Sequence, residues 1–383
     1  MAPNSKLNAK RKAQRESSNT STSTTNKPRA SEQPASDTAT TTAQLPLPLQ
    51  QLVLNIFRNS FAERLSSDYA PLLQEIKGYL YKRDFASAFG TPGYLEVYAA
   101  RWSASRALGY LDLFWELRRV LGVGGHGESG ESRFKVVCLG GGAGAEVVAL
   151  GGLQKRLLMG SGGEEDEDSD EKKVQKMEIT AIDIADWSVV VDSLTRHLTT
   201  TPTLSKYASA AAKAANVPFA NPDDIAITFT QHDVLQAPST SSTQTATTPT
   251  TPLDSTLAAA NLVTLLFTLN ELYTTSLAST QALLLHLTEL LQPGALLLVV
   301  DSPGSYSSVT LNGAAKKYPM HWLLDHTLLS QASRHAHERG REAVPRWEKV
   351  SEQESRWFRL DERLQYPIDL ENMRMQVHLY RRL

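Results

Sequence analysis

The stretch Val136-Val-Cys-Leu-Gly-Gly-Gly-Ala-Gly-Ala-Glu146 joins an apolar run to a glycine-rich turn. The apolar run, which starts at Phe134, predicts a buried strand, and residues 143–158 behind the turn predict a helix. Glycine lets the chain turn sharply and lets a ligand approach the backbone without meeting a Cβ atom. The first amide groups of the helix have no partner within the helix and face that ligand. The stretch therefore predicts a ligand site between a strand and a helix.

Further strand and helix patterns follow this stretch along the chain. Apolar runs predict strands at 178–183, 225–230, 262–268 and 295–300, and a helix is predicted from about 276 to 291. Alternating strands and helices predict a mostly parallel sheet covered by helices on both faces, which is a Rossmann-like α/β domain. Apolar and polar residues then alternate from 372 to 383, which predicts a last strand with no crossover helix after it.

Composition divides the chain into three parts. Residues 1–44 are rich in Ser, Thr, Asn and Ala, and we expect them to be disordered because they offer little apolar surface to bury. Residues 45–121 carry apolar side chains at helical spacing and predict an N-terminal helical unit. Residues 133–383 form the predicted ligand-binding domain, with low-complexity inserts at 160–173 and 238–254.

Charge and cysteine content exclude several classes of protein. The formal net charge is −2, so any contact with nucleic acid must come from a local basic patch. The single cysteine, Cys138, excludes a disulfide and a cysteine-rich zinc site, and we expect no metal site. The most apolar stretch, 281–300, is interrupted by His286, Glu289 and Pro293, so we expect no membrane span.

The glycine turn fits two adenosine-containing cofactors. Gly140, Gly142 and Gly144 form the G-x-G-x-G pattern typical of S-adenosylmethionine (SAM) sites, and the same turn with Ala145 also matches a dinucleotide fingerprint. Asp183 ends the second predicted strand, where a carboxylate accepts hydrogen bonds from ribose hydroxyls in either class of site. The turn residues predicted to bind cofactor are Gly140, Gly141, Gly142, Gly144 and Glu146.

Polar residues beyond the third and fourth strands favour SAM. Asp233 lies where SAM-dependent enzymes commonly bind the adenine amino group, although it could equally cap a turn. Asn270 and Glu271 close the fourth apolar run, at the crevice where the methyl group would meet its acceptor. We predict Asn270 as a cofactor contact and, with Glu271, as a catalytic residue. The alternative, an NAD(P)-dependent oxidoreductase, would need a Tyr-x-x-x-Lys pair after the fourth strand, and we find none there.

Three segments resemble a known family. They are 137–146, Tyr98-Ala-Ala-Arg-Trp-Ser-Ala-Ser-Arg-Ala-Leu-Gly-Tyr110 and 370–382, and together they are similar to the fungal 25S ribosomal RNA uridine-N3 methyltransferases. The resemblance spans roughly residues 50–383. It departs from the broader class of SAM-dependent enzymes at Cys138, where many members carry an acidic residue.

The resemblance implies both a fold and an activity. The fold would be that of class I methyltransferases, with a mostly parallel seven-stranded sheet, an antiparallel C-terminal strand and an N-terminal helical extension. SAM would be the cofactor, with its methionine part on Gly140, Gly142 and Gly144 and its ribose on Asp183. The substrate would be a flipped or single-stranded uridine, because N3 is buried in a paired base. A methyltransferase-like ribosome-assembly factor without activity is the remaining alternative.

The resemblance also implies a partner and a location. The partner would be ribosomal RNA or a preribosomal particle, bound by a monomer in the nucleus or nucleolus, with the cytoplasm as a second location. A basic run at 6–15 fits nuclear import, RNA contact or a solvated tail. Basic residues from Lys316 to Arg359, with Trp347, Trp357 and Phe358 among them, predict either an RNA surface or a solvated helix face with core tryptophans. Arg101, Trp102 and Arg106 would line the substrate side or serve the structure.

Overall fold

The computed structural model describes residues 45–123, 133–160, 175–214, 216–236, 251–304, 306–311, 314–338 and 344–383. The tail predicted at 1–44 lies outside these residues, and so does the insert predicted at 160–173 except for residue 160. So does most of the insert predicted at 238–254. Its last residues instead begin helix α11 (Pro252–Ala258), where Thr251 and Asp254 form a reciprocal capping box.

A seven-stranded sheet in the order β3-β2-β1-β4-β5-β9-β8 forms the centre of the domain. The first five strands along the chain are parallel, and β9 runs antiparallel to both β5 and β8. The strand order reverses between β1 and β4, which is where ligands bind in open α/β sheets. This topology confirms the predicted fold. The strands are β1 (Phe134–Leu139), β2 (Met177–Asp183), β3 (Ile225–Gln231), β4 (Leu262–Leu266), β5 (Leu296–Asp301), β8 (Trp347–Phe358) and β9 (Met373–Arg382).

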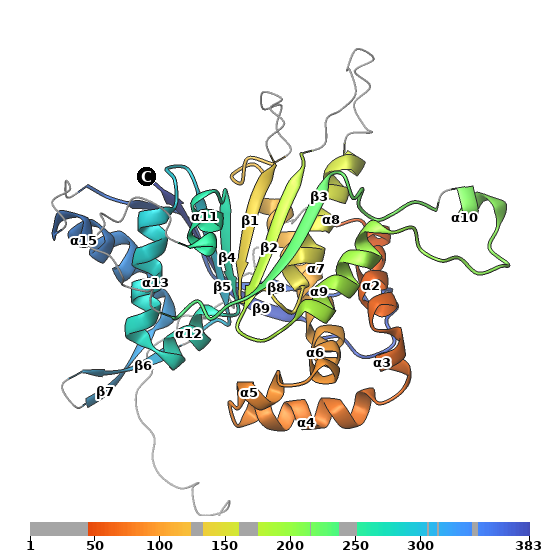
Figure 1. Ribbon diagram of the computed structural model, residues 1–383, viewed down its shortest axis with the longest axis horizontal. Coiled ribbons are helices and arrows are strands. Elements are labelled where there is room, and N and C mark those ends of the chain that lie inside the picture. Colours follow the sequence, from red (N-terminus) through yellow and green to blue (C-terminus); the bar gives the residue numbers. More distant parts are fainter. Residues whose placement is uncertain are drawn as a thin grey trace, which may run out of the picture. The chain divides into compact units, whose positions relative to one another are not determined.

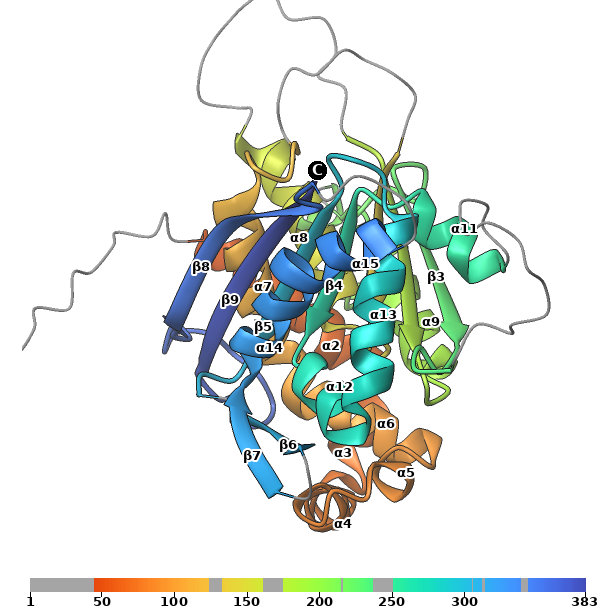
Figure 2. The same ribbon diagram turned by 90° about the vertical axis from the view of Figure 1, so that its left-hand side faces the viewer.

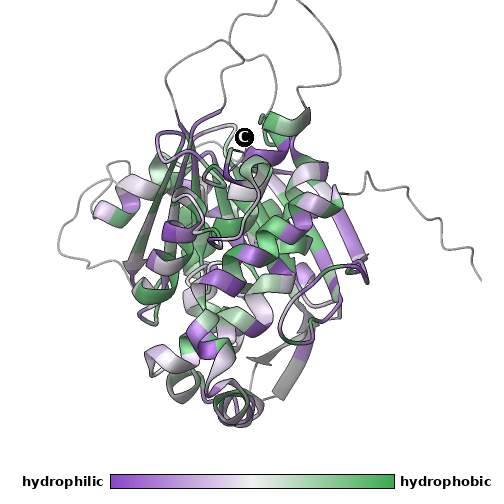
Figure 3. Cartoon of the chain, turned by 90° about the vertical axis from the view of Figure 1, so that its right-hand side faces the viewer, coloured by the Kyte–Doolittle hydropathy of each residue, from purple (hydrophilic) through white to green (hydrophobic). Residues whose placement is uncertain are grey.

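Helices cover both faces of the sheet and create two apolar cores (Figures 1 and 2). Successive residues of β1 point to opposite faces, so Val136 and Cys138 join one core while Val137 and Leu139 join the other. In Figure 3 the helices around the sheet carry both hydrophobic and hydrophilic residues. The first face carries α2 (Leu47–Ser60), α7 (Ala104–Leu117), α8 (Ala145–Gly160) and α9 (Ser188–Thr199). The second carries α11, α12 (Leu269–Thr275), α13 (Leu277–Leu290), α14 (Met320–Asp325) and the π-helical η2 (His326–Gln331).

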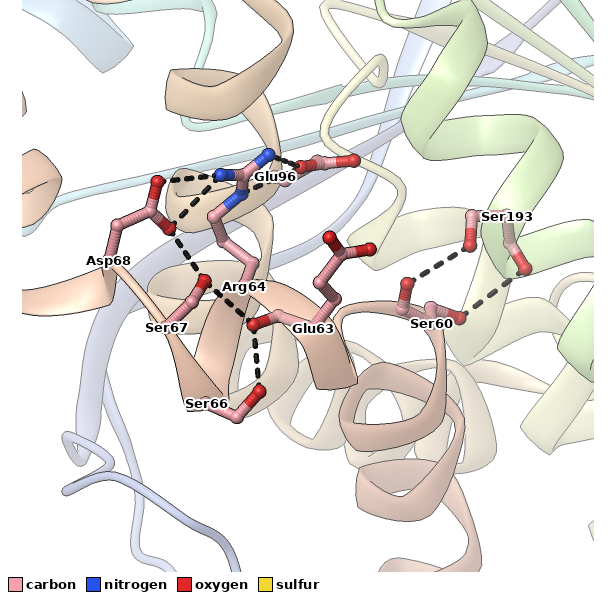
Figure 4. Close-up of polar contacts among 8 residues, drawn as sticks. All are labelled: Ser60, Glu63, Arg64, Ser66, Ser67, Asp68, Glu96 and Ser193. Carbon is pink, nitrogen blue, oxygen red and sulfur yellow. Dashed lines mark hydrogen bonds and ion pairs between the residues drawn. The ribbon is translucent and has the colours of Figure 1, made fainter.

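The helices between α2 and α7 lie at the carboxyl end of the sheet (Figure 1). Arg64 of α3 pairs with Asp68 and with Glu96 of α6, and the hydroxyls of Ser60 and Ser193 connect α2 to α9 (Figure 4). These helices are α3 (Ala62–Ser66), α4 (Tyr69–Tyr81), α5 (Phe85–Ala88), α6 (Pro92–Tyr98) and the π-helical η1 (Ala99–Ser103). The division of the chain into a helical unit and a second domain stays a prediction.

Two β elements were not foreseen from the sequence. The segment interpreted as a solvated helix face contains the edge strand β8, which is rich in Glu, Lys and Arg, as is common at sheet edges. The hairpin of β6 (Tyr306–Leu311) and β7 (Ala314–Pro319) follows β5. The helices α10 (Ala210–Ala214) and α15 (Ala332–Glu338) complete the described elements. No helix in the described ranges is long and apolar enough to cross a membrane.

The structure divides the aromatic and basic residues predicted between Lys316 and Arg359 into buried and exposed ones. Trp347 is buried and its indole N–H donates to the Thr288 hydroxyl at 2.8 Å, so it belongs to the core, as does the buried Phe358. Arg356 pairs with Asp112 and Glu116 of α7 and is therefore engaged within the protein. Trp357 remains 51% exposed. Arg339 and Arg341 lie outside the described residues.

Candidate active site

The turn after β1 requires glycine at two positions. Gly140 and Gly144 have φ angles of 76° and 77°, in the left-handed region that other residues rarely adopt. A Cβ atom at Gly140 would lie 2.4 Å from Oγ1 of Thr268, and one at Gly144 would lie 2.2 Å from Cδ1 of Leu194. Bare backbone at these positions allows the turn to pack against α9 and against Thr268, which directly precedes α12, and the turn leads directly into α8.

Asp183, at the end of β2, lies against this turn as the sequence suggested. Its carboxylate accepts hydrogen bonds from the backbone N–H groups of Gly142 and Ala185, both at 3.2 Å. Burial raises the pKa of Asp183, and these backbone donors oppose that rise. A Cβ atom at Gly142 would lie 2.2 Å from Cδ1 of Trp187, so the Trp187 ring covers the middle of the turn. The sequence analysis did not single out Trp187, which stands four residues after the predicted ribose ligand.

Glu146 lies beneath the turn. Its side chain is buried, accepts a hydrogen bond from the hydroxyl of Thr264 on β4, and approaches the position that a Cβ atom of Gly141 would take to within 2.8 Å. Burial raises the pKa of Glu146 to about 8. The buried Cys138 thiol is its neighbour, and its pKa is raised by burial and by the Glu146 charge. A carboxyl group therefore does stand beside Cys138, supplied by the helix instead of the strand.

Asp233 lies just beyond β3, next to the end of β2. The backbone N–H of His232 donates to the carbonyl oxygen of Asp183 at 2.8 Å, which holds the two strand ends together. The Asp233 carboxylate accepts from the backbone N–H of Leu235 at 2.9 Å. The residue caps a turn in this structure, and its predicted contact with adenine remains a prediction.

Asn270 and Glu271 stand at the start of α12, at the carboxyl end of β4. The chain reverses there because Phe267 has a φ angle of 59°, which ends the strand at Leu266, short of the predicted limit at 268. The backbone N–H of Asn270 donates to the Asp301 carboxylate of β5 at 3.1 Å. The side-chain oxygen of Asn270 is buried and has no hydrogen-bond partner among the residues that the structure describes.

The electrostatic environment of Glu271 suits a proton acceptor. Glu271 is solvent-exposed, yet the protein around its carboxyl group raises its pKa to about 7, chiefly because the group loses part of its hydration. The Arg106 charge opposes this rise, and the carboxylates of Asp301 and Asp183 add to it. A carboxyl group with a pKa near neutrality can accept a proton at physiological pH and release it again.

Aromatic side chains from the N-terminal helices pack around Trp187. The ring centroids of Phe89 and Tyr98 lie 5.4 and 5.7 Å from that of Trp187, and Trp102 packs on Tyr98 at 4.8 Å. The sequence left Trp102 between the substrate side and a structural role. In the structure it packs on Tyr98, which itself lies directly beside the residue that covers the glycine turn.

The arrangement fits an adenosyl cofactor with an amino-acid tail. The glycine turn exposes backbone at the start of the long helix α8, and Asp183 provides a carboxylate beside it. One buried polar atom near the turn, the Asn270 side-chain oxygen, lacks a hydrogen-bond partner among the described residues, so one acceptor remains for a ligand. The Trp187 indole N–H instead faces the Asp183 carboxylate and helps to lower its pKa. No cluster of metal-ligating side chains occurs within the described ranges.

Comparison with known proteins gives the same assignment. The Methyltransf_34 model, described as a SAM-dependent methyltransferase, matches residues 57–381. The chain is 33% identical over 358 residues to 25S rRNA (uridine(2843)-N(3))-methyltransferase of Saccharomyces cerevisiae, which covers 88% of each chain.

Solved structures give weaker similarities. An O-methyltransferase family protein from Burkholderia thailandensis is 13% identical, covering 82% of this chain and 70% of that one, with a TM-score of 0.33. A SAM-dependent methyltransferase from Methanosarcina mazei is 10% identical, covering 66% and 94%, with a TM-score of 0.32.

The family match removes the oxidoreductase alternative, which the glycine turn alone had left open. The strand order, the turn after β1 and the match over residues 57–381 agree with one another. The chain belongs to the Methyltransf_34 family of SAM-dependent methyltransferases, and its cofactor is S-adenosylmethionine.

Proposed function

We propose that this enzyme methylates N3 of a uridine in large-subunit ribosomal RNA. The observation that carries the proposal is the 33% identity, across 88% of both chains, to an enzyme named for that reaction. The crevice supports it independently, because Glu271 offers a proton acceptor with a pKa of about 7 at the carboxyl end of β4. Methylation of an imide nitrogen requires such a group, since the N3 proton must leave.

Each residue of the proposed site has a separate role in the reaction. SAM supplies an activated methyl group, so that the N3–methyl bond forms as the sulfur–methyl bond breaks and S-adenosylhomocysteine leaves. Glu271 accepts the N3 proton. Gly140, Gly142 and Gly144 receive the methionine part along bare backbone, and the Asn270 side-chain oxygen accepts a hydrogen bond there. Asp183 and Asp233 bind ribose and adenine.

The substrate uridine must be unpaired when it enters the crevice, because base pairing buries N3. Ribosomal RNA, free or in a preribosomal particle, is the partner that the proposed activity requires. A nuclear or nucleolar location with some protein in the cytoplasm follows from such a partner, and we propose that the protein acts as a monomer.

Mass spectrometry of nucleosides tests the proposed activity. Large-subunit RNA from cells that lack the protein should lose 3-methyluridine, and the purified protein with SAM should restore it. The variant Asp183→Asn, expected to bind SAM weakly, should fail to restore it. Unchanged 3-methyluridine in the deletion cells would contradict the uridine assignment. If the purified unmodified protein forms no 3-methyluridine, and Asp183→Asn restores ribosome assembly in the deletion cells, an inactive assembly factor is favoured instead.

A further inference from the structure

The guanidinium of Arg106 lies between two aromatic rings next to the proposed catalytic residues. Its Nη1 atom donates to the Tyr98 hydroxyl at 3.0 Å, and its carbon Cζ lies 5.0 Å from the ring centroid of Phe267 and 5.8 Å from that of Tyr98. Arg101 and Arg356 form ion pairs with carboxylates, whereas Arg106 forms none within the described part of the chain. Its remaining N–H groups are therefore available for a ligand.

Two unusual backbone segments hold this arrangement in place. Tyr98 and Arg106 are eight residues apart, and in a regular α-helix they would lie about 80° apart around the axis. The π-helical segment η1 lies between them and takes up an extra residue per turn, which brings their side chains to one face. Phe267, whose ring contacts Arg106, has its backbone in the left-handed region, a conformation that costs about 1–3 kcal/mol and is concentrated at functional sites.

Arg106 also faces the charged groups of the crevice. It interacts electrostatically with Glu271 of α12, which is in turn affected by Asp301 of β5, Asp183 of β2 and Arg83 after α4. The hydroxyl groups of Tyr98 and Tyr110 face Arg106 from the helical side. A uracil ring placed beside Glu271 would thus have the positive charge of Arg106 on one side and the proton-accepting carboxylate of Glu271 on the other.

We propose that Arg106 donates hydrogen bonds to a carbonyl oxygen beside N3 of the target uracil and stabilises the negative charge that forms when N3 loses its proton. This inference rests on the proposed function. Loss of the N3 proton to Glu271 leaves an anion delocalised onto the flanking carbonyl oxygens, and a guanidinium there stabilises the anion more than the neutral base. Cytosine carries an amino group at one of these positions. A guanidinium has only hydrogen-bond donors and cannot accept a hydrogen bond from that amino group, so Arg106 also favours uridine.

The matched variants are Arg106→Gln, Arg106→Lys and Arg118→Gln. Arg118 lies near the end of α7, 4.1 Å above the Trp115 ring, and provides a second arginine on an aromatic ring outside the crevice. Single-turnover rates are measured with SAM and a uridine-containing large-subunit RNA transcript between pH 6 and 9, the pH range bracketing about 7. Calorimetric titration with SAM measures the affinity of each variant and checks that it is folded and binds the cofactor.

We expect Arg106→Gln to lower the rate at neutral pH by about 10²–10³-fold, as for loss of one anion-stabilising donor. Its pH profile should move to higher pH, because both the N3 proton and the Glu271 proton become harder to remove without the positive charge. Arg106→Lys should keep the profile while losing part of the rate, and Arg118→Gln should match the unmodified enzyme. SAM affinity should stay within about twofold throughout, which is under about 0.5 kcal/mol.

A transcript containing 5-fluorouridine provides the decisive test, because its N3 proton is more acidic. It should accelerate Arg106→Gln far more than the unmodified enzyme. Equal acceleration of both, or an unshifted pH profile, would overturn the role of Arg106 while leaving the proposed function intact. Absence of 3-methyluridine with the unmodified enzyme would reject the proposed function, and the Arg106 inference with it. If Arg106→Gln does not fold, the Arg106→Lys profile and its response to 5-fluorouridine decide the question.

Discussion

The hydroxyl of Thr264, in the middle of β4, donates a hydrogen bond to the carboxyl group of Glu146 in the first turn of α8. Both side chains are buried, at 0% and 3% exposure, directly beneath the glycine turn. The contact joins the strand that carries Asn270 and Glu271 at its end to the helix that begins the cofactor site. Burial raises the pKa of Glu146 to about 8, so this link contains a mostly protonated carboxyl group at neutral pH.

Glu146→Gln should therefore remove a pH dependence of stability. The pKa of Glu146 is about 8 in the folded chain against 4.5 when unfolded, so protonation favours folding. The contribution of protonated Glu146 to the free energy of unfolding is complete below pH 4.5. It is lost as the pH rises towards 8, at up to about 1.4 kcal/mol per pH unit. Urea unfolding from pH 5 to 8.5 measures it. The variant should gain relative stability at the alkaline end, and parallel curves for both proteins would contradict the assignment.

The sequence predicted the five parallel strands well because each is an apolar run between turn signals. Val136 to Leu139, for example, has no charged residue and is buried on both faces. β8 escaped prediction because it is a charged edge strand whose pairing depends on β9. The hairpin β6–β7 escaped because its segment contains no alternating apolar pattern.

The residues of the candidate site could likewise be predicted from the sequence only in part. Asp183, Asn270 and Glu271 could be placed from sequence because each follows a predicted strand, and the carboxyl ends of parallel strands meet at one edge. The contact of Arg106 with Phe267 joins segments about 160 residues apart along the chain, and only the packed structure reveals it. The sequence could not decide whether Arg106 faced the core or the crevice.

The pH dependence of catalysis should report Glu271. Because only its unprotonated form accepts a proton, the rate should rise with pH through about 7. Glu271→Gln should lose this dependence and reduce single-turnover rates by about 10²–10⁴-fold, with unchanged SAM affinity. The control Glu63→Gln alters an exposed carboxylate of α3 and should leave the profile unaltered. A Glu271→Gln enzyme with the unmodified rate would exclude Glu271 as the base.

Gly142→Ala should weaken SAM binding for a steric reason and not because of backbone strain. The φ angle of Gly142 is not in the left-handed region, so the cost is steric: its Cβ would lie 2.2 Å from Trp187 and 2.8 Å from Asp183. Displacement of both side chains should raise the dissociation constant at least about tenfold, or about 1.4 kcal/mol. Gly78→Ala on α4, with open space around it, should keep the affinity and stabilise the helix by up to about 1 kcal/mol. Equal affinity in both variants would show that Trp187 and Asp183 do not contribute to binding.

The ion pair between Arg356 of β8 and Asp112 of α7 should matter for folding. The two side chains are 9% and 12% exposed, so Arg356→Gln would leave a buried carboxylate whose pKa burial already raises. We expect a loss of about 3–5 kcal/mol in the free energy of unfolding. Arg381→Gln, which breaks an ion pair exposed at 39% and 52%, should cost about 1 kcal/mol or less. Urea unfolding compares the two, and similar losses would refute the role of burial.

Trp357 is the aromatic residue of β8 that keeps an exposed ring, and the structure leaves it available for RNA. It is 51% exposed, and the guanidinium groups of Arg359 and Arg374 lie 5.0 and 5.6 Å from its ring centroid. β8 runs parallel to β5, so Trp357 stands near the carboxyl end of the sheet, on the side where the substrate enters.

Trp357→Ala should therefore weaken binding to large-subunit RNA by about 1–3 kcal/mol, the value of one stacked base. SAM affinity should not change, because the ring lies outside the cofactor site. The matched control is Tyr207→Ala, which removes an 84% exposed ring with Lys206 at 4.9 Å. Filter binding at fixed salt compares the variants. If both lose the same RNA affinity, general surface charge and not stacking on β8 accounts for binding. If Trp357→Ala alone keeps full affinity, the RNA follows another path across the sheet edge.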